Sequence, residues 1–179
     1  MKLKIILLML LSSTFASFSQ TLLQNKTASE ITFKIKNFGL NVDGVFKDFT
    51  ISSNFNSANI KACFFNAEIS VKSIFTDSEG RDKHLLEPDY FDAEKHPKIV
   101  FESTTIEKAA SANYLLKGFL TIKGVKKRVA TTLEVIESKL EIRLLANFSL
   151  DRRDFGVGSN SFVLSDEVNI KMIYVATKN

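Results

Sequence analysis

Residues 140–150 read LEIRLLANFSL, and apolar side chains occupy every second position of this stretch. A period of two is typical of a strand with one apolar face, because successive side chains of a strand point to opposite faces. The residues on that face are Leu140, Ile142, Leu144, Ala146, Phe148 and Leu150. Seven further segments alternate in a similar way: 31–35, 49–55, 63–71, 101–105, 114–122, 125–135 and 168–176. About eight strands joined by short turns predict an all-β antiparallel barrel or sandwich.

The composition is that of an ordinary globular protein, with 45% hydrophobic and 25% charged residues among 179, so we expect one domain. The single cysteine, Cys63, excludes an intramolecular disulfide, and two histidines are too few for a Cys/His zinc site. In the predicted strand 63–71, Cys63 lies on the same face as the apolar side chains and is therefore predicted to be a buried, inert thiol. We therefore expect no metal and no cofactor.

Residues 1–19 have the organisation of a secretory signal peptide. Lys2 and Lys4 form a positively charged start, residues 5–11 are apolar, and small side chains are frequent after them. Cleavage is expected after Ser19, with cleavage after Ala16 as the alternative. No apolar run is long enough to span a membrane. We expect a periplasmic or secreted protein in which residues 20–179 form a single β-barrel domain.

The charge balance gives no reason to expect a nucleic-acid partner. The formal net charge of the chain is +4, and removal of residues 1–19 takes away two lysines and no acid, which leaves +2.

One internal segment, 76–97, breaks the alternation and is polar and charged. Asp77 or Ser78 can cap a helical turn that runs to Leu86 and ends before Pro88, and a second turn can begin at Pro88. The sequence therefore predicts a short helical crossover around residues 77–95. A connection this long exceeds what a hairpin needs, so it is expected to cover one end or one side of the barrel.

The same segment carries a family resemblance. Its Thr76, Arg81-Asp82, His84-Leu85, Tyr90-Phe91-Asp92 and Pro97 resemble the signature of the YceI-like family. The likeness extends over about residues 28–177, through Phe33 and Gly44, the stretch GFLTIKGV at 118–125, and Arg152 with the stretch DFG at 154–156. The resemblance implies a lipocalin-like eight-stranded antiparallel barrel that binds long apolar chains, such as polyisoprenoids, in a hydrophobic lumen. Asn37 stands where many members carry a histidine, so a role of that histidine does not transfer.

Strand parity and the resemblance together predict the ligand-binding residues. The expected lumen contacts are Phe33, Ile35, Phe49, Ile51, Phe65, Ile69, Phe101, Leu116, Leu120, Leu144, Phe148, Ile170 and Met172. Weaker candidates for the polar end of the ligand are Arg81, His84 and Arg152. The alternative for the polar cluster is structural: Arg81 and Asp82 would pin the crossover with hydrogen bonds and an ion pair, while His84 bonds a backbone carbonyl. Arg152 and its neighbours would form a charged turn at one barrel end.

We therefore expect an exported, non-enzymatic protein that holds a polyisoprenoid or fatty-acyl amphiphile for transport, storage or sequestration. No catalytic residue is predicted. Two alternatives stay open: an enzyme acting on an isoprenoid or quinone-like substrate, and a stress-related interaction module with a filled barrel. The expected partner is the lipid ligand, and a homodimer also remains possible.

Overall fold

A computed structural model of the protein describes residues 21–178, and the predicted signal peptide lies outside this range. The described residues form eleven strands: β1 (Leu23–Gln24), β2 (Glu30–Asn37), β3 (Leu40–Phe46), β4 (Phe49–Ser53), β5 (Phe65–Ser70), β6 (Ile74–Phe75), β7 (Lys98–Ala110), β8 (Asn113–Ile122), β9 (Val125–Glu137), β10 (Glu141–Asp151) and β11 (Leu164–Thr177). The helical elements are α1 (Glu79–Leu86) and three short 3₁₀ helices, η1 (Ser57–Ala62), η2 (Val71–Ser73) and η3 (Arg152–Phe155).

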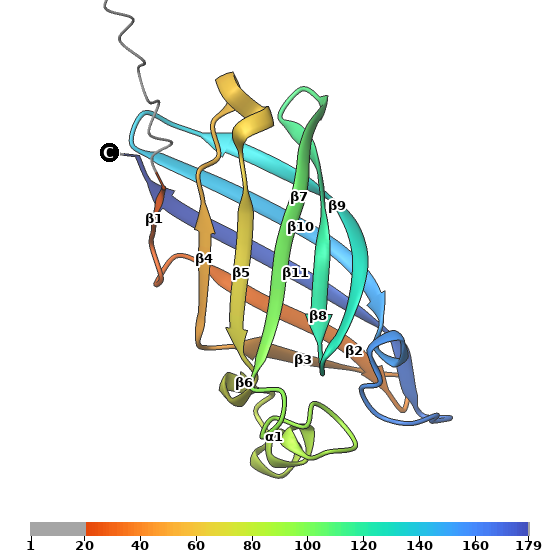
Figure 1. Ribbon diagram of the computed structural model, residues 1–179. Coiled ribbons are helices and arrows are strands. Elements are labelled where there is room, and N and C mark those ends of the chain that lie inside the picture. Colours follow the sequence, from red (N-terminus) through yellow and green to blue (C-terminus); the bar gives the residue numbers. More distant parts are fainter. Residues whose placement is uncertain (1–20, 179) are drawn as a thin grey trace, which may run out of the picture.

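All strand pairs are antiparallel and belong to one sheet, in the order β4-β5-β7-β8-β9-β10-β11-β2-β3-β6. The sheet curls into a barrel-like shape, with β7 and β8 in front of β10 and β11 in Figure 1. At one end β1 pairs with β11, and the adjacent Leu22 donates its backbone N–H to the carbonyl of Ser53 in β4, 2.7 Å away. The short strand β1 therefore lies between the two sides of the curled sheet.

The predicted all-β antiparallel fold is confirmed, but the strands number eleven among the described residues, where the sequence predicts eight. The missed strands are β1, β3 and β6. Two of these are only two residues long, too short to show a period. In β3 the alternation is interrupted at Gly44, where a Cβ atom would lie 2.1 Å from Cζ of Phe33. The ring of Phe33 thus takes the place that a side chain at position 44 would fill.

The helical crossover is also confirmed. Helix α1 follows Ser78 and ends at Leu86, with Glu87 as its C-cap directly before Pro88. It lies below the end of the sheet where β7 begins (Figure 1). The predicted second helical turn is wrong, since residues 88–95 form hydrogen-bonded turns instead. In these turns Asp92 accepts the backbone N–H of His96 at 2.8 Å through its carbonyl oxygen.

The interior of the barrel is filled at the end away from α1. There Ile142 and Leu144 of β10 are buried, and Tyr174 of β11 is completely buried against Phe65, with ring centroids 5.9 Å apart. Further along β10, the inward-facing Phe148 and Leu150 are only partly buried. The core is therefore packed at one end and opens toward α1 at the other.

Substitution of Leu144 tests this packed end. We expect Leu144→Ala to lower the free energy of unfolding by about 2–5 kcal/mol, because the surrounding side chains cannot collapse into the vacated space. Leu145→Ala, on the opposite face of β10, is the matched control and should cost less. Urea unfolding measures both, and equal losses would contradict the assignment of Leu144 to the filled core.

The pH dependence of stability offers a second test. Burial raises the pKa of Tyr174 to about 12, whereas tyrosine in an unfolded chain ionises near pH 10. Between these values the folded state binds more protons than the unfolded state, so stability falls as pH rises, by up to about 1.4 kcal/mol per pH unit. Tyr174→Phe should remove this contribution. The free energy of unfolding of both proteins is measured against pH by urea unfolding. If the two free energies change with pH in the same way over this range, the hydroxyl is not buried.

Candidate functional site

A cavity of about 550 Å³ occupies the open end of the barrel. Its floor is the inner face of the sheet, and α1 with the residues after it covers one side. The β2–β3 turn and the segment between η3 and β11 form the rest of the wall. The apolar lining residues include Phe33, Ile35, Val42, Phe46, Ile74, Leu85, Tyr90, Phe91, Ile99, Ile122, Leu150, Phe155, Val157, Val168 and Ile170.

A smaller cavity of about 110 Å³ adjoins this one and is lined by residues nearer the middle of the barrel. The two share walls made by Phe33, Ile99 and Ile170. The deeper walls are apolar except for two threonines, and Phe65 and Phe101 meet there with ring centroids 6.3 Å apart. The interior therefore holds two adjoining, mostly apolar cavities, and the smaller one has the more apolar lining.

Most of the predicted lumen residues line these two cavities. They are Phe33, Ile35, Phe65, Ile69, Phe101, Leu116, Leu120, Phe148, Ile170 and Met172. Phe49, Ile51 and Leu144 are buried in the core but line neither cavity. The alternation of apolar residues along a strand shows which side chains point inward, but it does not show where along the barrel the interior is filled.

The cavity walls also include residues that lie outside the alternating strands and were therefore not predicted from the alternation. Leu85, Tyr90 and Phe91 come from the crossover, and Phe38 and Val163 come from two connections between strands. Tyr90 and Phe91 belong to the family signature, which is a signal that could have placed them at the site. Phe38 and Val163 lie in turns without a period, so no sequence pattern points to them.

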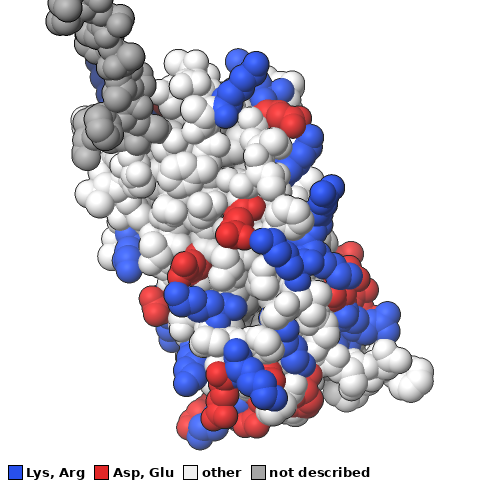
Figure 2. Space-filling view, in the orientation of Figure 1, with Lys and Arg blue, Asp and Glu red and all other residues white. Residues whose placement is uncertain are grey.

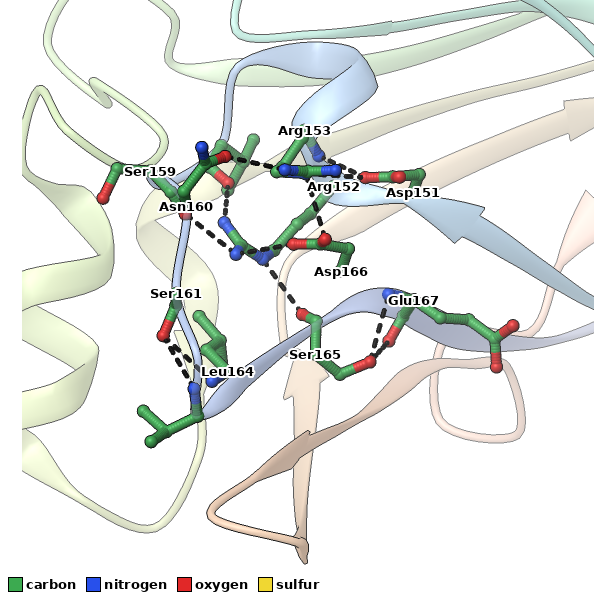
Figure 3. A network of polar contacts seen from close by, with 12 residues as sticks. Asp151, Arg152, Arg153, Ser159, Asn160, Ser161, Leu164, Ser165, Asp166 and Glu167 are labelled. Atoms are coloured by element: carbon green, nitrogen blue, oxygen red, sulfur yellow. Dashed lines mark hydrogen bonds and ion pairs between the residues drawn. The ribbon is translucent and has the colours of Figure 1, made fainter.

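Arg152 is 4% exposed and holds the segment after η3 against the barrel end (Figure 3). Its Nη2 donates to a carboxylate oxygen of Asp166 at 2.9 Å. Its guanidinium also donates to three backbone carbonyls, those of Val157 at 2.8 Å, Ser159 at 2.9 Å and Ser165 at 3.0 Å. These bonds satisfy a buried cation that would otherwise be costly beside an apolar cavity.

Gly158 makes room for this arrangement. Its φ of +70° is in the left-handed region that glycine adopts readily. A Cβ atom at this position would lie 2.6 Å from Nη1 of Arg152. The predicted charged turn at a barrel end is therefore present, and its arginine is engaged by the protein's own carbonyls.

Thr76 organises the start of the crossover. The carboxylate of Asp82 accepts the backbone N–H of Thr76 at 2.9 Å and its hydroxyl at 2.5 Å. Arg81 donates from Nε to the hydroxyl oxygen of Thr76 at 2.7 Å and from Nη2 to its carbonyl at 2.6 Å. The link between Arg81 and Asp82 thus runs through Thr76, where the structural alternative predicts a direct ion pair. Both Thr76 and Arg81 line the cavity.

His84 lies at the exposed edge of the cavity. Its Nε2 is 3.2 Å from a carboxylate oxygen of Asp89, and its ring packs edge-on against Tyr90 with centroids 4.8 Å apart. The partner of His84 is therefore a carboxylate and a ring, where the structural alternative predicts a backbone carbonyl.

Cys63 lies between η1 and β5, outside the strand to which the sequence assigns it. The half-buried Sγ accepts the backbone N–H of Asn56 at 3.1 Å and donates to the carbonyl of Asn59 at 3.4 Å. Burial raises the pKa of the thiol, which disfavours the reactive thiolate. The geometry therefore agrees with an inert cysteine, although the thiol is less buried than the sequence predicts.

Within residues 21–178, no group of three or more His, Cys, Asp or Glu side chains is placed to hold a metal ion. Over the same range, no helix is both long enough and apolar enough to cross a membrane.

The role of Arg152 can be measured by stability. We expect Arg152→Met to lower the free energy of unfolding by about 3 kcal/mol or more, because three carbonyls and a carboxylate lose a charged donor. Arg153→Met is the matched control: its exposed side chain also contacts Asp166, at 3.0 Å, and the change should cost about 1 kcal/mol or less. Equal losses in urea unfolding would contradict a pinning role for Arg152.

Comparison with known proteins gives relatives over part of the chain. UPF0312 proteins of Photorhabdus laumondii and Pseudomonas savastanoi pv. phaseolicola are 37% identical over 107 residues and 33% identical over 100 residues. These alignments cover 59% and 55% of this chain, and 55% and 52% of the relatives. The chain thus spans about half the length of the curated relatives it matches.

Solved structures match the fold over more of the chain. BcnA of Burkholderia cenocepacia superimposes with a TM-score of 0.83 and 26% identity, over 86% of this chain and 99% of that one. A YceI protein of Campylobacter jejuni gives 0.72 and 29%, over 78% and 86%. A polyisoprenoid binding domain from Saccharophagus degradans gives 0.68 over 89% and 98%, and at 15% identity it shows the shared fold alone.

The family predicted from the sequence motifs is tested directly by a family model. The YceI-like domain model matches residues 24–176, nearly the whole of the described chain. The chain therefore belongs to the YceI-like family.

Proposed function

We propose that this protein binds one long-chain apolar or amphipathic molecule, a polyisoprenoid or a fatty-acyl chain, in the cavity at the open end of the barrel. The observation that carries the proposal is the mostly apolar lining of the 550 Å³ cavity and of the smaller cavity that adjoins it. The larger volume falls within the range of about 300–1,000 Å³ of typical ligand sites. A filled-barrel interaction module does not fit such a hollow interior.

The energetics favour an extended hydrocarbon chain. Each methylene group taken from water contributes roughly 0.8 kcal/mol, so ten of them supply about 8 kcal/mol before the cost of binding is subtracted. A compact polar metabolite would lose its hydrogen bonds to water against these walls without replacing them. The polyisoprenoid binding domain of Saccharophagus degradans, which shares this fold, supports the same class of ligand.

The polar end of the ligand is proposed to lie at the α1 side of the cavity. Arg81 and His84 line the cavity there, and both carry nitrogen atoms that can donate to an oxygen. Arg152 is a poorer candidate than Arg81, because its guanidinium already donates to Asp166 and to three carbonyls. Its proposed contribution is to hold the cavity wall in place.

We further propose that the ligand is carried, stored or sequestered outside the cytoplasm. This part rests on the signal-peptide features of residues 1–19, which predict export. A long apolar molecule would need such a carrier in any aqueous compartment, because its own solubility is low.

A charged group placed in the cavity wall tests ligand binding. We expect Phe148→Glu to abolish binding of the fluorescent fatty acid 11-(dansylamino)undecanoic acid, because the carboxylate would be desolvated against the chain. Asn147→Glu adds the same charge on the exposed, opposite face of β10 and should leave binding unchanged. Competition with geranylgeraniol and with hexadecanoate compares the two ligand classes.

The same variants serve for the native ligand. Organic extracts of the purified protein, analysed by mass spectrometry, should contain a long-chain lipid that is absent from extracts of the Phe148→Glu variant. If the folded Phe148→Glu variant binds the probe as the unaltered protein does, the ligand does not occupy this cavity.

A further inference from the structure

Exposed apolar side chains gather at the rim of the cavity. Phe38 in the β2–β3 turn is 74% exposed, and Leu40, the first residue of β3, is 73% exposed. Phe162 and Val163 are exposed in the connection that precedes β11. The two connections lie side by side, because Phe38 donates its backbone N–H to the carbonyl of Val163 at 2.8 Å. We call these four residues the apolar rim. Figure 1 shows both connections at the end of the barrel that carries α1.

The turn at Phe38 has no structural need for a phenylalanine. Phe38 and Gly39 form a two-residue hairpin loop in which both residues have positive φ, +50° and +77°. Such loops favour Asn-Gly, and a bulky side chain at positive φ is a rare and costly choice. The ring also gains little from burial within the protein, since it is mostly exposed. A residue that costs conformational energy and stays in water points to a contact outside the molecule.

The rim is continuous with the ligand cavity. Phe38 and Val163 line the cavity and also reach its outer edge, whereas Leu40 and Phe162 lie only on the outside. The apolar rim therefore combines side chains of the cavity wall with side chains of the outer surface.

The chemistry of the rim indicates what it contacts. Residues 37–42, NFGLNV, and 156–164, GVGSNSFVL, contain no charged side chain. The projection at the lower right of Figure 2 is accordingly free of both blue and red. An uncharged tip with protruding aromatic and aliphatic side chains can enter the acyl boundary of a bilayer without moving a charge out of water.

The small size of the rim argues against a second copy of the chain. A stable protein interface takes about 20–30 residues and roughly 800 Å² from each partner. The rim offers four exposed apolar side chains on two narrow connections. A bilayer does not require a complementary surface of that extent.

We infer that the apolar rim docks the protein on a lipid bilayer, with the cavity mouth facing the membrane. In this position an apolar ligand passes between the bilayer and the cavity without exposing its chain to water, where each methylene costs roughly 0.8 kcal/mol. The inference rests on the proposed function for the identity of the cargo, but the docking itself is measured without it.

The test uses Leu40→Ser together with Phe162→Ser, since neither side chain lines the cavity. Flotation with phosphatidylcholine vesicles should show the unaltered protein bound and the double variant weakened by about tenfold per side chain removed. Leu140→Ser is the matched control, because Leu140 is 77% exposed, directly precedes β10 and lines neither of the two cavities. Since every variant shares the rest of the chain, any contribution from residues 1–20 is common to all.

Three further readouts make the outcomes distinct. The double variant should take up 11-(dansylamino)undecanoic acid from buffer with unchanged affinity, but extract it from vesicles more slowly than the unaltered protein does.

If Leu140→Ser weakens vesicle binding as much as the double variant does, or if the unaltered protein does not float, the docking inference is overturned. Analytical ultracentrifugation that shows a dimer lost only in the double variant, without vesicle binding, would overturn it in favour of a second copy. Failure of the unaltered protein to take up the probe from buffer would instead refute the proposed function.

Discussion

The antiparallel pairing of β10 with β11 runs over eleven residue pairs and sets the inward-facing residues of both strands along the whole barrel. Within this ladder Leu144 pairs with Tyr174, and both are completely buried. Four residues further along β10, Phe148 pairs with Ile170, and both line the smaller cavity. A single register thus supplies a solid core and a hollow site from the same alternating pattern. The stability of the filled end allows the open end to remain unfilled.

The polar residues around the open end hold its wall. Arg152 donates hydrogen bonds to three carbonyls and to Asp166. Thr76 is hydrogen-bonded to both Arg81 and Asp82. Segments without regular hydrogen bonding would otherwise expose backbone groups to an apolar space at considerable cost. Because these bonds are internal, the cavity stays mostly apolar even though Arg81 and Arg152 line it. Arg81 and His84 are the groups proposed to meet a polar head.

The cavity, its rim and the proposed cargo share one physical requirement, the exclusion of water from hydrocarbon. A wall that accepts an acyl or isoprenoid chain needs a mouth through which the chain can enter, and a mouth surrounded by charge would impose a barrier. The uncharged turns at Phe38 and Phe162 lower that barrier where the cavity opens. The proposed docking and the proposed ligand binding therefore share Phe38 and Val163, which belong both to the rim and to the cavity wall, whereas Leu40 and Phe162 belong to the rim alone.

The sequence alone determined eight of the eleven described strands, the crossover helix and the family, because these follow from local periodicity, capping and motif spacing. Ten of the thirteen predicted lumen residues accordingly line the cavities. Only the tertiary structure decided which inward positions are filled, because packing density depends on side chains brought together across the curled sheet from distant segments. It also decided that Gly44 belongs to a strand covered by Phe33, that Arg152 is committed to internal carbonyls, and that Phe38 and Val163 meet at the mouth. These outcomes depend on contacts between connections, which no period along the chain encodes.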